Sequence, residues 1–550
     1  MSTTSSPQSC DAERASLWSR VHPDLDGDVA VSSTPAAPLP DHVDVVVVGA
    51  GLVGLSTAVM LAERGASVCV LESRHIGAGT TGHSTAKVSL LQGTRLSQIL
   101  RRQGRERGTA YVAGNRAGQS WLLARADELG VAHQTRAAVT YADVESEVAT
   151  AEEELTAATA LGLDVTWREP DDVGREVSFP FAGGVALAGQ AQLDPLAMLL
   201  ALADRARALG VSIHEHTRAT AALRGRVTTP AGEVTGEHVV VASGIPFTDS
   251  GGFFARVEPH RSYALALELP DGRVPPLDMH LSTGSPSRSV RDAVLPGGRA
   301  ALVVGGNGHV VGRSTSERGA VADLTAWAQR YFPGLPLIAS WSAQDYTPVD
   351  QLPFVGPLLP LGERTLVATG FGKWGMAAAP AAATVLTATI TGEAAPDWAE
   401  AFGSWEGHEA RGITTAISTN LGVAARLVGD RVRTVGEPTG AAWAGDAAAP
   451  SDTASDPGPD SASAEPSTGD PVEGAGWTTG GPLRPVAVST VGGRTRRVSA
   501  VCPHLGGVLR WNDAECTWDC PLHGSRFEPD GTLLEGPATH DLTPRETETS

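Results

Sequence analysis

Lysine is scarce in this chain of 550 residues. Lys87 and Lys373 are its two lysines, so arginine supplies the rest of the 42 Lys and Arg side chains, against 62 Asp and Glu. The formal net charge of −20 at pH 7 argues against binding to nucleic acid or to an anionic membrane surface. The chain also lacks an uninterrupted apolar run of about 18 residues, so the sequence predicts no membrane span.

The first 40 residues lack the features of a secretory signal, because they contain neither a basic start nor an apolar stretch. We therefore expect a cytoplasmic location. We interpret residues 1–40 as a polar tail, in which Leu17 and Trp18 are candidates for docking on the folded body. The remaining length and a hydrophobic fraction of 41% predict a globular protein of two or three domains.

Two pairs of Cys and His lie near the C-terminal end: Cys502 with His504, and Cys520 with His523. Two Cys and two His suit a tetrahedral Zn²⁺ site as well as an iron–sulfur cluster. Structural zinc modules usually pair Cys with Cys and His with His, whereas each pair here holds one of each. The pattern therefore favours a cluster with two thiolates on one iron and two imidazoles on the other. The segment from about 475 to 545 resembles a Rieske domain, which implies a 2Fe-2S cluster and one-electron chemistry.

Four positions close to these ligands can be compared with the Rieske pattern. Many Rieske proteins carry a further Cys in each ligand loop, where this chain has Gly507 and Leu522. Ser525 is kept, and its hydroxyl would donate to the cluster and raise its potential. Phe527 stands where relatives often have a tyrosine, so a second hydroxyl donor is missing.

A dinucleotide-binding motif lies near the start of the chain. Residues 44–48, an Asp and four Val, read as a buried parallel strand, and Gly49, Gly51 and Gly54 follow as G-x-G-x-x-G before an apolar helix. A second predicted strand ends at Glu72. The glycines would permit a tight turn and close approach of a diphosphate, and the carboxylate would accept a hydrogen bond from a ribose hydroxyl.

Four further segments favour FAD over NAD as the dinucleotide. They are a Gly/Thr-rich loop over 76–87, which simple NAD domains lack, the Gln-Leu-Asp-Pro run at 192–195, a strand that ends at Gly244, and the opening of a long helix over 369–376. In this order they resemble the D-amino-acid oxidase and glycine oxidase superfamily over about residues 40–395, in the branch that ends in a fused Rieske domain. The resemblance implies these FAD-binding residues: Gly49, Gly51, Gly54, Glu72, Thr80, Thr81, Ser84, Thr85, Lys87, Gly244, Gly370, Gly372, Gly375 and Met376.

The predicted fold class is α/β, with a Rossmann-type FAD-binding domain, an inserted mixed-sheet α+β substrate domain and a C-terminal all-β Rieske domain. The predicted boundaries are a tail over 1–40, the FAD-binding domain over 41–395 with substrate segments near 96–185 and 255–340, a helical segment over 396–435, a disordered acidic linker over 436–475 and the Rieske domain over 476–545.

Both lysines lie in predicted flavin-facing motifs, where an ammonium group would stabilise the reduced flavin or hold a water for oxygen. The alternative is a pair of solvated side chains. Sarcosine oxidase-like relatives hold the substrate carboxylate with a Lys at the position of Ala377, so that anchor is absent. Relatives with covalent FAD have a Cys near the position of Gln344, so that attachment is not expected. The candidate catalytic and pocket residues are Lys373, Trp374, Arg261, Tyr263 and Arg291.

The resemblance implies FAD-dependent oxidation of a C–N bond in a small amine or amino acid. Hydride would pass to the flavin, and the electrons would pass through the cluster to an external acceptor, a protein or oxygen. Two alternatives stay open: a reductase or electron-transfer component driven by NAD(P)H, for which no second nucleotide motif is found, and a redox sensor that uses the same pair of cofactors. Oxidation of a C–O bond is a further alternative.

Overall fold

The computed structural model describes residues 14–23, 38–173, 177–270, 272, 275–362, 364–407 and 470–545. These residues fall into two compact units, one within Met1–Val311 and Gly319–Gly422, the other within Gly312–Arg318 and Val423–Ser550. Most of the predicted helical segment 396–435 and of the predicted linker 436–475 lies outside the described residues. No helix in the described ranges combines the length and the hydropathy that a bilayer span requires.

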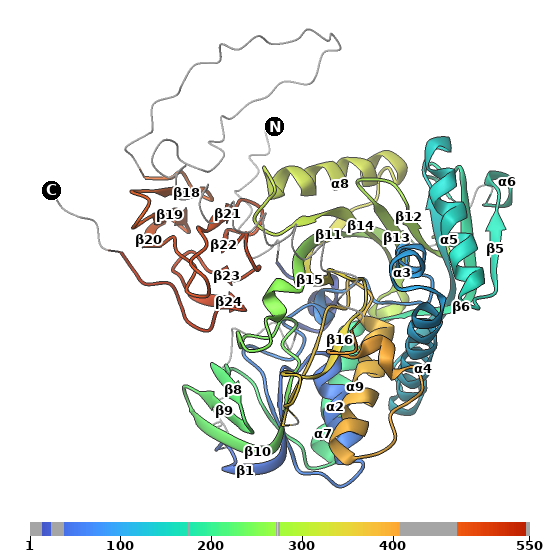
Figure 1. Ribbon diagram of the computed structural model, residues 1–550. Helices are drawn as coiled ribbons and strands as arrows, with labels where there is room; N and C mark the ends of the chain where they lie inside the picture. The colour runs from blue at the N-terminus through green and yellow to red at the C-terminus, as the bar shows by residue number, and fades with distance from the viewer. Residues whose placement is uncertain are drawn as a thin grey trace. The chain divides into compact units, whose positions relative to one another are not determined.

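The first unit contains a mostly parallel sheet (Figure 1). Val45 to Val47 of its central strand are fully buried, as expected for a strand covered on both faces. The strands, in spatial order, are β16 (Phe354–Pro357), β17 (Thr365–Thr369), β10 (Gly232–Val241), β1 (His42–Val48), β2 (Val68–Leu71) and β7 (Ser212–His214), while β9 (Arg226–Thr229) pairs with β10 and with β8 (Ala221–Leu223).

Four helices pack together beside this sheet. They are α2 (Leu52–Ala62), α4 (Arg105–Leu129), α7 (Pro195–Ala208) and α9 (Gly375–Thr391). Helix α2 contacts α7 and α9, and α4 also contacts α9. The close approach of α4 to α9 requires Gly118, because a Cβ there would overlap the carbonyl oxygen of Ala377.

A second, mixed sheet belongs to the same unit (Figure 1). Its strands, in spatial order, are β15 (Leu337–Pro348), β11 (Val257–Leu269), β14 (Ala300–Val310), β13 (Arg288–Val294), β12 (Met279–Ser282), β4 (His133–Ala142), β6 (Gly183–Leu193) and β3 (Lys87–Val88), with β5 (Val165–Arg168) also paired to β6. The sheet is mixed because β12 and β4 pair in parallel, whereas its other pairs are antiparallel. Strands β6 and β15 run past the predicted limits 185 and 340.

Helices accompany the second sheet. Leu324 and Ala328 of α8 (Glu317–Tyr331) join Leu265 of β11 in one buried hydrophobic cluster. The other helices here are α3 (Arg95–Gln103), α5 (Val148–Ala160) and α6 (Pro170–Val173).

A short helix near the start of the chain, α1 (Leu17–Val21), also packs on the first unit. Its Leu17 and Trp18 are each 1% exposed. Residues 14–23 therefore do not form part of a loose tail.

The second unit contains two small antiparallel sheets (Figure 1). One consists of β18 (Gly476–Thr479), β19 (Val486–Val491) and β20 (Arg494–Ser499), and the other of β21 (Arg510–Asn512), β22 (Thr517–Asp519), β23 (Arg526–Phe527) and β24 (Leu533–Glu535). Their buried side chains form a hydrophobic cluster of their own, which includes Val498, Trp518 and Phe527. This is the all-β domain that the sequence predicts.

Candidate functional site

The turn after β1 needs its glycines. Gly49 has φ +106°, and a Cβ there would lie 2.6 Å from the carbonyl oxygen of Ala242. A Cβ at Gly54 would overlap the carbonyl oxygen of Gly49. At Gly51, the N-cap of α2, the nearest atom to a Cβ would be Thr81 Oγ1 at 3.6 Å. This helix N-terminus is thus open to a close backbone contact with a phosphate.

Glu72 follows β2 and points back to the same turn. Its Oε2 accepts a hydrogen bond from Ala50 N–H at 2.9 Å, and its Oε1 accepts one from Arg74 N–H at 2.9 Å. These bonds fix the carboxylate beside the glycine turn, where a ribose hydroxyl would be its further donor.

The Gly/Thr-rich loop contacts two elements through its threonines. Thr81 Oγ1 accepts from the N–H of Leu52 at 3.3 Å, and Thr80 Oγ1 donates to the carbonyl of Gln344 at 2.6 Å. Ser84 Oγ accepts from Ala86 N–H at 2.9 Å within the loop, and Thr85 is half-buried. The loop therefore connects the N-terminus of α2 with β15.

Other predicted FAD-binding residues lie just after β10 and in the turn that leads into α9. Gly244, Gly370 and Gly372 all have positive φ, between +56° and +80°. Arg95 holds this segment, because its Nη1 donates to the carbonyl of Gly372 at 3.2 Å. Gly375 and Met376 are the first two residues of α9. The glycine turn, the carboxylate of Glu72 and the open helix N-terminus together suit the diphosphate and ribose of FAD.

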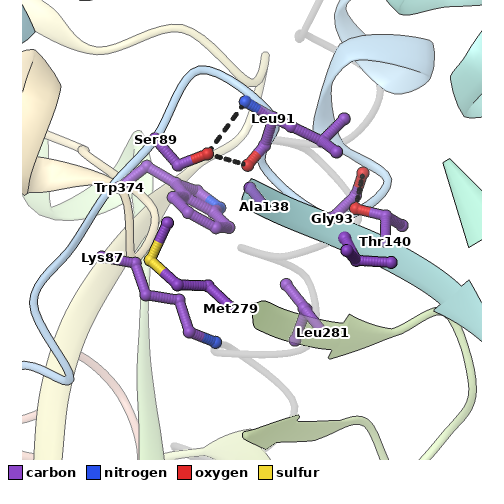
Figure 2. A pocket seen from close by; sticks show the side chains of 10 residues that line it. Lys87, Ser89, Leu91, Gly93, Ala138, Thr140, Met279, Leu281 and Trp374 are labelled. Carbon is purple, nitrogen blue, oxygen red and sulfur yellow. Dashed lines mark hydrogen bonds between the residues drawn. The ribbon is translucent and has the colours of Figure 1, made fainter. Parts of the chain in front are cut away.

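A small cavity lies over β4 and β12 (Figure 2). Lys87 and Trp374 line it, together with these mostly apolar residues: Ser89, Leu91, Gly93, Ala138, Val139, Thr140, Met279 and Leu281. The sequence singled out the first two and missed the rest. Strands β4 and β12 lie about 140 residues apart in the chain, and nothing in their alternation says that they pair.

Lys87 of β3 is 8% exposed, and its ammonium reaches β12 and β13 of the same sheet. Nζ donates to the carbonyl of His280 at 3.0 Å and to the hydroxyl of Ser289. Burial, with repulsion from Arg291, lowers the pKa of Lys87 to about 7. Close to neutral pH this amine is therefore divided between its charged and neutral forms.

The other catalytic candidates lie outside this cavity lining. Lys373 is exposed and donates from Nζ to Ser262 Oγ at 2.7 Å. Arg261 is fully buried, and its Nη2 donates to Gln344 Oε1 at 2.8 Å. Tyr263 is 2% exposed in the cluster that α8 covers.

Arg291 is also kept away from the cavity. It is 1% exposed, donates from Nη2 to the carbonyl of Leu193 at 3.2 Å, and lies with its guanidinium carbon 5.0 Å from the ring centre of Trp18. The anchor position Ala377 is buried in α9, 1% exposed.

In the second unit, the two predicted ligand loops share one backbone pattern. Cys502 N–H donates to the carbonyl of Gly507, and Cys520 N–H to that of Ser525, both at 2.8 Å. Each cysteine carbonyl in turn accepts, at 3.0 Å, from the glycine four residues later. The two loops thus present their side chains in similar ways.

The four side chains form two pairs. The buried side chains of Cys502 and Cys520 interact with each other, and the ring centres of His504 and His523 lie 5.0 Å apart, with an angle of 82° between the rings. Two pairs suit a cluster of two irons better than one tetrahedral zinc.

The four predicted ligands differ in how far they are buried. Cys502, Cys520 and His523 are 1 to 3% exposed, whereas His504 is half-buried. A Cβ at Gly507 would lie 2.7 Å from Leu522 Cδ1. The side chain of Leu522 therefore fills the space where many Rieske proteins have the two further cysteines.

Comparisons with known proteins identify the family of each part of the chain. Residues 44–389 match the family model of FAD dependent oxidoreductases, and residues 475–545 match that of the Rieske [2Fe-2S] domain. A Bacillus subtilis protein described as a Rieske 2Fe-2S iron-sulfur protein, YhfW, is 30% identical over 527 residues, which cover 93% of this chain and 94% of the relative.

Solved structures share the fold of the first unit. The L-proline dehydrogenase of P. horikoshii matches with a TM-score of 0.55 and 18% identity, over 66% of this chain and 98% of that one. The glycine oxidase of Geobacillus kaustophilus matches with a TM-score of 0.54 and 20% identity, over 64% of this chain and 96% of that one.

Proposed function

Because this chain belongs to the family of FAD dependent oxidoreductases and carries a Rieske [2Fe-2S] domain, we propose that it oxidises a C–N bond in a small amine or amino acid. When bound, FAD supplies the acceptor for the hydride that leaves the substrate carbon. The substrate would lose this hydride and a proton and become an imine. Cys502, His504, Cys520 and His523 would hold the cluster, which would supply one-electron transfer to an external acceptor, a protein or oxygen.

The observation that carries the substrate class is the cavity with Lys87 and Trp374. It is small and mostly apolar, and its lining includes one cationic side chain and no carboxylate. The apolar walls would exclude water, and the charged form of Lys87 would bind a substrate carboxylate. The resemblance to glycine oxidase and L-proline dehydrogenase structures supports an amino acid, although it concerns the fold alone.

The test is an anaerobic titration of the purified full chain with amines and amino acids, followed by visible and EPR spectroscopy. A substrate that bleaches the flavin and then produces the EPR signal of a reduced Rieske cluster supports the proposal. Reduction by NADH but by no amine or amino acid would replace it with the reductase alternative. Reduction by dithionite alone would contradict both.

Lys87→Met tests the anchor. We expect a 10- to 100-fold rise in KM, roughly the loss of one charge-assisted hydrogen bond, for an amino acid but not for the matching amine without a carboxylate. Binding of the substrate carboxylate should also weaken as the pH rises through about 7, because the ammonium group of Lys87 in the substrate-free enzyme then loses its proton. An equal effect on both substrates would contradict this role.

A further inference from the structure

Three consecutive carbonyl groups of the Gly/Thr-rich loop accept hydrogen bonds from side chains outside the loop. The pairs are Ser16 Oγ to Gly82 O at 2.8 Å, Trp341 Nε1 to His83 O at 2.9 Å, and Trp18 Nε1 to Ser84 O at 2.7 Å. These carbonyl groups lie at the C-terminal end of the short 3-10 helix η3 (Thr81–His83). A following helical turn would supply backbone N–H donors to them, but the helix ends here. Two of the three donors come from residues 14–23, here called the N-terminal segment.

The other side of the same loop faces the dinucleotide motif. Thr81 Oγ1 accepts from the N–H of Leu52, the first residue of α2 after Gly51. The loop is also folded tightly on itself, since a Cβ at Gly82 would overlap the carbonyl oxygen of Gly77. The loop therefore lies between the N-terminal segment and the helix N-terminus that suits the diphosphate.

The N-terminal segment has its own attachments to the first unit. Trp18 is buried against the guanidinium of Arg291 and joins a hydrophobic cluster with Trp341. His22 Nε2 lies 2.9 Å from Asp194 Oδ2, while Asp194 Oδ1 caps the N-terminus of α7. The indole N–H of Trp18 is thus held at a fixed position on the loop.

We infer that the N-terminal segment holds the Gly/Thr-rich loop in its FAD-binding conformation, and that Trp18 is a positioning residue for FAD. A loop that is already ordered loses less conformational freedom when the dinucleotide binds. The affinity for FAD falls with the fraction of chains whose loop is ordered, so a change that frees the loop weakens FAD binding. The segment therefore sets how long the chain retains its flavin, independently of the substrate.

The test compares two variants of the full chain. Trp18→Phe keeps the aromatic packing and removes the N–H donor to Ser84. Val227→Ala removes two methyl groups from a fully buried position in β9, within another hydrophobic cluster, and serves as the control for lost stability. Two quantities are measured: amide hydrogen exchange of residues 78–86, and the rate of flavin release from its fluorescence after dilution.

We expect Trp18→Phe to speed exchange in the loop and to raise the rate of flavin release about tenfold, the equivalent of one hydrogen bond. Val227→Ala should change neither. Unchanged exchange in Trp18→Phe would overturn the inference, as would faster exchange without faster flavin release. An equal effect of both variants would also overturn it, because the loss would then reflect general stability.

Discussion

At the scale of single residues, the hydroxyl of Ser525 lies beside Cys502, a predicted cluster ligand. It is fully buried, accepts from Ala538 N–H at 3.0 Å, and is hydrogen-bonded to Cys502. Ser525→Ala should lower the cluster potential, because a donor to the thiolate stabilises the reduced, more negative cluster. A loss of about 1.4 kcal/mol corresponds to about 59 mV for one electron. Redox titration followed by EPR measures this, with Ser525→Thr, which keeps the hydroxyl, as the control; equal potentials for the Ala and Ser forms would contradict it.

Glu154 is a residue whose charge should tie stability to pH. It is fully buried in α5 and accepts from the N–H groups of Leu96 and Ser97 at the start of α3. Burial raises the pKa of Glu154 to about 7, whereas the pKa of a Glu in the unfolded chain is about 4.3. Between these values the native chain holds a proton that the unfolded chain has released. The stabilisation from the protonated carboxyl of Glu154 is therefore complete at low pH. As the pH rises to about 7, the free energy of unfolding falls by about 1.4 kcal/mol for each pH unit.

Glu154→Gln should remove this part of the pH dependence. Urea unfolding at several pH values measures the slope of the free energy of unfolding. Glu152→Gln, on the same helix but exposed, is the matched control and should keep the slope of the original chain. If both variants keep it, the charge of Glu154 has no such role.

At the scale of elements, the turn from β1 into α2 depends on Gly54. A methyl group there would overlap the carbonyl of Gly49, so Gly54→Ala must displace α2 from the end of β1. We expect the affinity for FAD to fall at least tenfold, so that the purified variant loses most of its FAD. The ratio of the absorbance at 450 nm to that at 280 nm measures the FAD content. Gly305→Ala adds the same methyl group in β14 at an ordinary distance, 3.5 Å from the nearest atom, and should retain FAD. Full flavin content in Gly54→Ala would contradict this account of the turn.

The sequence predicts those parts of the fold whose signals are local. The strand at 44–48, the glycines and Glu72 all lie within 30 residues, and the structure has β1, the turn, α2 and β2 there. The cavity is different, because its walls come from β4 and β12, which pair across the chain without any local sign. Tyr263 illustrates another limit: the register of β11 shifts between Arg261 and Tyr263, and such a shift is not visible in the alternation of the sequence.

At the scale of the whole molecule, the two units have separate hydrophobic clusters. Cys502→Ser should therefore abolish the cluster signal while the FAD content and the substrate-dependent bleaching of the flavin stay within about twofold. Electron delivery to a one-electron acceptor should fall about tenfold or more if the cluster is the exit. Anaerobic stopped-flow with a cytochrome as acceptor separates the two steps. An unchanged rate of delivery would show that electrons leave from the flavin directly.

The scarcity of lysine has a practical consequence. Lys87 is buried and Lys373 is exposed, and arginine is not acylated by reagents that modify amines. An activated ester would therefore find Lys373 as its accessible lysine, at the residue before Trp374 in the turn that opens α9. A fluorophore or a biotin group attached in this way would be placed, without engineering, beside the predicted flavin site, and acetylation of the same amine would act there too.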